Sequence, residues 1–130
     1  MGKQATFTRM QDGTKEEWMI IAGEHAEAFK TTADRFIGYL RDLEKVTVGF
    51  AVNQLHHCLM TATLARQADA SDEEIILALC HDMGKAINIP NHGAIAAEMM
   101  RPYISENGYH VIYNHQAFQG EYYYEYLGAP

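Results

Sequence analysis

The segment SDEEIILALCHDMGK, residues 71–85, constrains the fold more than any other part of the chain. Ser71 and Glu74 have the spacing of a capping box, which predicts a helix start, and an almost unbroken apolar run follows. A helix that is apolar on nearly every side is expected at the centre of a bundle. This helix nevertheless ends in His81 and Asp82, and a buried carboxylate is costly unless it is paired or bound to a metal.

Helical spacing of apolar residues recurs along the rest of the chain, and no segment shows the alternation of a strand. Thr14 and Glu17 form a second capping box after an irregular arm over residues 1–13. Gly84 is expected to cap the central helix. Further helices are predicted over residues 14–29, 33–43, 52–68, 91–103, 109–119 and 121–127. In the first two of these, apolar residues recur at Trp18, Ile21, Ala22, Ala26 and Phe29, and at Phe36, Ile37, Leu40 and Leu43. The core candidates of the helix over residues 52–68 are Val52, Leu55, Leu59, Ala62 and Leu64. The predicted fold class is all-α, a compact bundle with one domain over residues 14–130.

The composition of the chain disfavours some classes of binding partner. The 130 residues carry 17 acidic and 10 basic side chains, a formal net charge of −7, which disfavours a nucleic-acid partner because that affinity needs clustered cations. No apolar run is long enough for a membrane span, and the N-terminus lacks a signal core, so no membrane partner and a cytoplasmic location are expected. Cys58 and Cys80 lie within apolar helical patterns and are predicted to be buried, reduced thiols.

Four of the seven histidines fall where they can meet Asp82. His57 precedes His81 by one helix, while His92 and His115 follow on the next two. Side chains from several antiparallel helices can converge in a bundle core. A bridging Asp82 would then serve two metals, with two histidines completing each side. Imidazole and carboxylate suit iron, manganese, zinc or other first-row ions.

A single histidine on a helix is more often a surface or core residue than a ligand, and His25 and His110 match no pattern, so neither is predicted to bind metal. The apolar helix that ends in His81 and Asp82, followed by Lys85, is the stronger signal. An ammonium at Lys85 would neutralise a phosphonate or phosphate oxygen. The competing interpretation is that Lys85 only stabilises the end of a helix through the macrodipole.

The motif HDMGK, with the order His57, His81–Asp82, His92 and His115, resembles the HD superfamily of metal-dependent phosphohydrolases in its dinuclear branch. The stretch GFAVNQLHHCLMTATLARQADASDEEIILALCHDMGK is more similar to the HD oxygenases that cleave organophosphonates, relatives of myo-inositol oxygenase. The likeness covers roughly residues 46–128.

The resemblance implies a mixed-valence diiron site, in which one iron chelates the substrate and the other binds dioxygen. It implies that the first iron is held by His57, His81 and Asp82, and the second by Asp82, His92 and His115. Asp82 and Lys85 are then the catalytic candidates. Lys85, Gln54 and Gln119 are the candidate contacts to a small anionic substrate.

Two alternatives stay open. The first is an HD phosphohydrolase with manganese, zinc or magnesium, in which a metal-activated hydroxide attacks a phosphate ester. The second is an inactive metal-binding HD module.

Several positions depart from the family pattern. Thr47 and Phe50 stand where the phosphonate oxygenase carries a Tyr-x-x-Glu gate, and Gln119 stands where it carries a lysine. The HD pattern closes with a later aspartate ligand, whereas only Glu121 and Glu125 follow here. We therefore expect a C-terminally incomplete domain with weak metal occupancy on the His57 side, and either a homodimer or a longer natural chain that covers the terminal aromatic residues.

Overall fold

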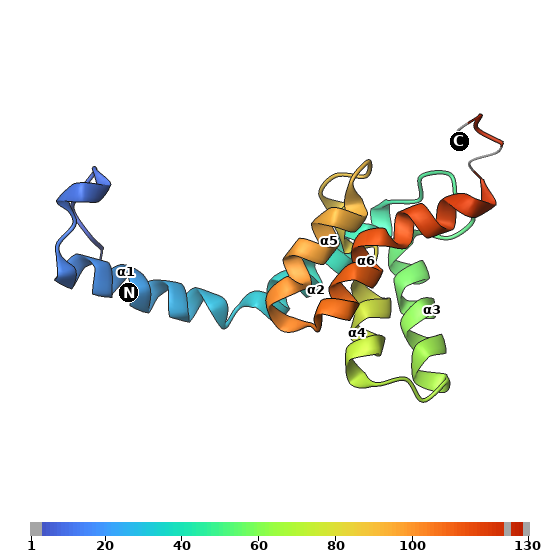
Figure 1. Cartoon of the computed structure of the whole chain (residues 1–130), viewed down its shortest axis with the longest axis horizontal. Helices are drawn as coiled ribbons and strands as arrows, with labels where there is room; N and C mark the ends of the chain where they lie inside the picture. The colour runs from blue at the N-terminus through green and yellow to red at the C-terminus, as the bar shows by residue number, and fades with distance from the viewer. Residues whose placement is uncertain (1–3, 124–125, 129–130) are drawn as a thin grey trace. The chain divides into compact units, whose positions relative to one another are not determined.

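The computed structural model describes residues 4–123 and 126–128 (Figure 1). The chain forms two compact units, Met1–Ile37 and Gly38–Pro130. In the described ranges all regular structure is helical, which confirms the all-α prediction. The α-helices are α1 (Lys15–Phe29), α2 (Thr32–Asp42), α3 (Gln54–Gln67), α4 (Asp72–Cys80), α5 (His92–Met100) and α6 (Glu106–Gln119). Short 3-10 helices are η1 (Met10–Asp12), η2 (Leu43–Lys45), η3 (Met83–Ala86), η4 (Arg101–Tyr103) and η5 (Gly120–Tyr122).

The first unit is built on α1. This helix begins at the predicted capping box, in which Thr14 accepts from the backbone N–H of Glu17 and the Glu17 carboxylate accepts from Thr14. The arm packs on it through Phe7, whose ring centroid lies 5.1 Å from that of Trp18. No residue of α1 is buried, although apolar side chains recur on it at helical period at Trp18, Ile21, Ala22, Ala26 and Phe29. An apolar face on a helix becomes buried only when a second apolar layer packs against it. The short arm before α1 provides little apolar surface of this kind.

The second unit holds the core and the site. Its buried apolar side chains come from α2 to α6 and the 3-10 helices between them: Leu40, Leu43, Cys58, Leu77, Cys80, Met83, Ala96, Ala97, Met100 and Ile112. Helices α3 and α4 pack against each other across a short connection, and α5 packs along α6 (Figure 1). The burial of the two free cysteines is as predicted.

Helix α3 has the predicted spacing but a different inward face. Gln54 and Cys58 are its buried residues, whereas Leu59 and Leu64 are 49% and 64% exposed. Val52, another predicted core residue, is also exposed, as is Ile37 on α2. The spacing of apolar residues indicates how wide the apolar face of a helix is, but it does not decide which side of the helix turns toward the core. The inward face of α3 carries the polar side chains that line the site rather than the largest apolar ones.

Helix α4 begins at the predicted Ser71–Glu74 capping box but ends at Cys80, four residues before Gly84. It is also not buried all round, because Ile76 is 49% exposed. Gly84 lies in η3, and the prediction that it caps α4 is wrong. A Cβ atom at Gly84 would come within 2.2 Å of the carbonyl oxygen of His92. Glycine is required at this position because the first residue of α5 crosses directly over it.

The predicted helix over residues 121–127 is represented by η5 alone among the described residues, while Tyr124 and Glu125 lie outside them. Phe118, Tyr122 and Tyr126 are largely exposed. Within residues 4–123 and 126–128, no helix has the length and apolar character that crossing a membrane requires.

Candidate metal centre

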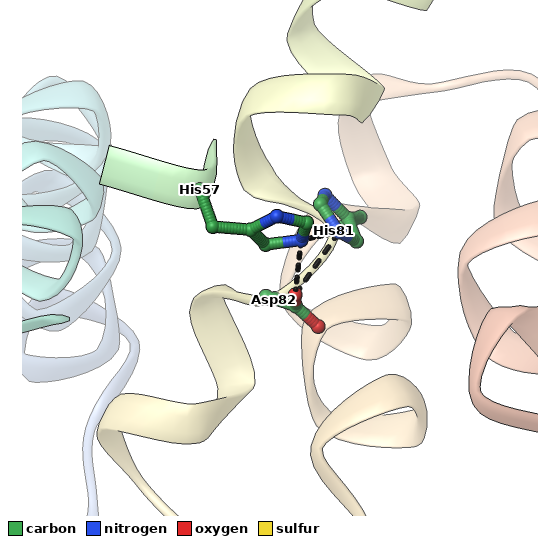
Figure 2. Close-up of side chains that lie close together, drawn as sticks. All are labelled: His57, His81 and Asp82. Carbon is green, nitrogen blue, oxygen red and sulfur yellow. Dashed lines mark hydrogen bonds and ion pairs between the residues drawn. The ribbon is translucent and has the colours of Figure 1, made fainter. Parts of the chain in front are cut away.

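The five predicted site residues meet at one carboxylate. Figure 2 shows His57 and His81 turned toward the same oxygen of Asp82, and both Nε2 atoms lie 3.0 Å from Oδ2. The other oxygen, Oδ1, lies 3.2 Å from Nε2 of His92 and 3.0 Å from Nε2 of His115. Asp82 therefore presents one oxygen to each pair of imidazoles. We call His57, His81 and Asp82 the α3–α4 triad, and Asp82, His92 and His115 the α5–α6 triad.

Local backbone geometry orients three of the four rings in the same way. Nδ1 of His81, His92 and His115 lies 2.6–2.8 Å from the carbonyl oxygen three residues earlier in each case. A carbonyl oxygen can only accept, so Nδ1 carries the proton and Nε2 faces Asp82. In the neutral ring Nε2 then has its lone pair free for a metal, and a backbone carbonyl on the other nitrogen is the usual outer partner of a metal-binding histidine. Sequence reasoning missed these carbonyls because their alignment depends on the local backbone.

Burial and charge act together on the centre. Burial raises the pKa of Asp82, but hydrogen bonds from His115 and His81 outweigh it and hold the pKa well below its ordinary range. The pKa of His81 is lowered by burial but raised more by its hydrogen bond to Asp82 and by the charge of that residue, with a net increase. At His57 burial dominates and lowers the pKa. The carboxylate is thus ionised and surrounded by imidazoles that a proton or a metal can occupy.

The donor set fits divalent metals. The donor atoms of each triad all lie within 4.8 Å of one another, as they must if one ion is to reach all three. Nε2 of His92 is buried without a hydrogen-bond partner, although it lies 3.2 Å from Asp82, and a buried polar atom of this kind calls for a ligand. Two ions bridged by Asp82 would satisfy both the carboxylate and the unpaired nitrogen. His25 and His110 belong to neither triad, and neither does exposed His56.

Lys85 stands in a cavity of about 250 Å³ that opens onto the α3–α4 triad, with His57 and Asp82 in its wall. Its Nζ lies 3.7 Å from Oδ2 of Asp82 and donates to Oε1 of buried Gln54 at 2.9 Å. The ring of Phe50 covers the ammonium, with its centroid 5.4 Å from Nζ. We call this cavity the Lys85 pocket. Since α4 ends before Lys85 and the ammonium faces the site, the helix-end interpretation does not describe its contacts.

The remaining predicted site residues are placed less centrally. Gln119 is exposed and lines the Lys85 pocket together with Val52, Tyr122 and Tyr123. Glu121 is exposed and joins neither triad, and Glu125 lies outside the described residues. The contact of Lys85 with Phe50 was not predicted, because nothing in the spacing of residues 50 and 85 indicates that they meet.

A cluster of four imidazoles around one buried carboxylate in a helical bundle defines a metal-binding module. The HD domain family profile matches residues 55–126, more than half of the chain, and the chain therefore belongs to the HD domain family. No curated protein matches it significantly. The matched range holds all five residues of the two triads and Lys85, so the family assignment and the geometry concern the same site.

Proposed function

We propose that this chain is a dinuclear HD-domain oxygenase, in which two irons and dioxygen oxidise a small hydroxylated substrate that carries a phosphonate-like anion. One observation carries the proposal: each triad is formed by two histidines and one carboxylate. Two histidines and a carboxylate on one side of an ion leave other positions open, and this is the donor set of non-haem iron oxygenases. Bound iron would supply the redox chemistry with dioxygen.

The protein residues divide the remaining work. Asp82 would hold both ions, and the backbone carbonyls on Nδ1 would fix the ring orientations. Lys85, held by Gln54 and covered by Phe50, would attract the anionic group of the substrate into the pocket beside His57. The exposed side chain of Gln119 would contact the substrate at the outer wall of this pocket.

A phosphohydrolase is the second candidate, because the same Lys85 pocket suits a phosphate ester and a bound metal can generate hydroxide. Loading with iron or with manganese under controlled oxygen separates the two reactions. The oxygenase consumes dioxygen with a 2-hydroxyalkylphosphonate and releases phosphate only in air. The hydrolase releases phosphate from esters without oxygen.

The test begins with anaerobic loading of the chain with ferrous iron, followed by metal analysis and electron paramagnetic resonance. We expect two irons per chain and a mixed-valence signal after partial oxidation. His57→Ala should lose one iron, whereas His56→Ala, the exposed neighbour on the same helix, should keep both. A chain that binds no iron, or that turns over only phosphate esters without oxygen, would refute the oxygenase.

A further inference from the structure

A second cavity, of about 380 Å³, reaches the cluster between α4 and α6. Its lining includes His81 and His115, whereas the Lys85 pocket is lined by His57 and Asp82. The two cavities thus contact different members of one cluster. We call the second cavity the α4–α6 groove.

The groove follows both helices with the same spacing. Along each helix, a polar residue near the N-terminal end is followed by an apolar residue about one turn later and by a histidine after about two turns. These residues are Glu73, Leu77 and, directly after the end of α4, His81, and on α6 Asn107, Val111 and His115. The helices run side by side in the same direction. Near their N-terminal ends the Glu73 carboxylate accepts from the backbone N–H and the hydroxyl of Ser105, and at the other end the rings of His81 and His115 lie 5.1 Å apart.

The chemistry of the lining indicates what the groove admits. Its middle walls are the aliphatic side chains of Leu77, Ala78, Val111 and Ile112. Among the described residues, its lining includes two acids, Glu73 and Glu74, and no lysine or arginine. The groove therefore offers an anion no counterpart of the ammonium that faces the Lys85 pocket. The apolar walls, with two imidazole rings in the lining beside the centre, favour a small uncharged molecule.

We propose that the α4–α6 groove is the site and route by which a small neutral ligand, dioxygen in the oxygenase, reaches the His81–His115 side of the centre. The anionic substrate enters separately through the Lys85 pocket. This inference rests on the proposed function, because it requires a metal at the cluster. It adds Ala78 and Val111 as residues that control ligand access without touching the metal.

The test uses the ferrous, anaerobic protein with nitric oxide as the probe, and stopped-flow absorbance records the rate at which iron binds it. Ala78→Leu and Val111→Phe place bulk in the groove, while Val52→Phe places it in the Lys85 pocket as the matched control. We expect both groove variants to slow nitric oxide binding at least about fivefold, because a blocked route lowers an association rate. Both substitutions keep the backbone carbonyl of residue 78 that orients His81 and alter no side chain of the centre, so the iron content and the affinity for methylphosphonate should be unchanged. Val52→Phe should weaken methylphosphonate binding and leave the nitric oxide rate unchanged.

Val111 is 51% exposed, so Val111→Phe keeps the test valid if Ala78→Leu unfolds. Wild-type rates in folded, iron-loaded groove variants would overturn the inference while leaving the proposed function intact. Slower ferrous iron uptake with unchanged nitric oxide binding would also overturn it, because the groove would then be a route for metal ions. A wild-type chain without iron would instead refute the proposed function, and metal analysis shows this separately.

Discussion

The two triads share Asp82 but differ at one histidine, because the His81 side chain is 10% exposed, as deeply buried as those of His92 and His115, whereas His57 is accessible. In the α5–α6 triad, the side chains of His92 and His115 are 7% and 11% exposed. In the α3–α4 triad, the His57 side chain is 37% exposed and stands in the wall of the Lys85 pocket. Donors that are buried and oriented by backbone carbonyls suit an ion held permanently. An accessible donor beside an ammonium suits an ion that meets substrate, so we propose that the substrate binds on the side of the α3–α4 triad.

The largest effect on metal content is expected from a substitution at Asp82, the residue that the two triads share. Asp82→Ala removes the carboxylate oxygen facing each pair of histidines, so both ions should be lost. His92→Ala removes a donor from the α5–α6 triad alone and should retain about one ion per chain. Metal analysis after dialysis against free metal measures both. Equal metal retention in the two variants would contradict a bridging carboxylate.

Gly84→Ala should damage one triad and spare the other. The added Cβ would meet the backbone of His92, which must move, so the ion of the α5–α6 triad should be lost. The overpacking should lower the free energy of unfolding by about 3 kcal/mol. Gly38→Ala on α2 is the matched control, because a Cβ there meets nothing within 4 Å and alanine favours a helix.

Denaturant unfolding and metal analysis measure the effects of both glycine substitutions. Full metal content in Gly84→Ala would show that the start of α5 can shift while the His92 side chain keeps its position beside Asp82. The α5–α6 triad would then be less rigid than its burial indicates.

Lys85→Met should affect only the substrate side. The methionine keeps the unbranched shape and most of the length of the side chain but removes the ammonium that faces the pocket beside Asp82. We expect methylphosphonate to bind the metal-loaded protein about tenfold more weakly, the loss of one charge-assisted contact of about 1.4 kcal/mol. Isothermal titration measures this affinity, with exposed Lys45→Met as the control. Unchanged affinity with intact metal content would remove Lys85 from the substrate site.

The sequence predicted the fold class and the four histidines that meet at Asp82, because both depend on strong local signals. The capping boxes at Thr14 and Ser71 define helix starts through contacts within three residues. The order of the histidines along successive helices predicted which side chains form the site.

Features that depend on packing between segments were missed. The rotation of α3, which exposes Leu64, is set by which neighbours α3 meets. The role of Gly84 is set by the approach of His92, a residue outside its own element. The domain bounds predicted from periodicity, residues 14–130, remain a prediction beside the compact unit Gly38–Pro130.

The last expected effect, which needs no change at the substrate side, is a difference between the two triads in how metal affinity depends on pH. Asp82 holds the pKa of His81 above the ordinary value, about 6.5 for histidine, despite burial. A metal binds neutral imidazole, so a proton must leave His81 first, and affinity at the α3–α4 triad should fall as pH falls through this raised pKa. The lowered pKa of His57 keeps that ring neutral over the same range, and ionised Asp82 adds no proton of its own.

Gly84→Ala protein, which should retain only the α3–α4 ion, isolates this dependence. Cobalt titrations of that variant between pH 8 and pH 6 should show affinity falling with a slope that approaches about one decade per pH unit, the signature of one displaced proton. His57→Ala protein, which should retain only the α5–α6 ion, provides the comparison. An affinity in the Gly84→Ala protein that stays constant over this range would mean that His81 is already neutral. Its contact with Asp82 would then be too weak to hold a proton against burial, and accessibility alone would distinguish the two triads.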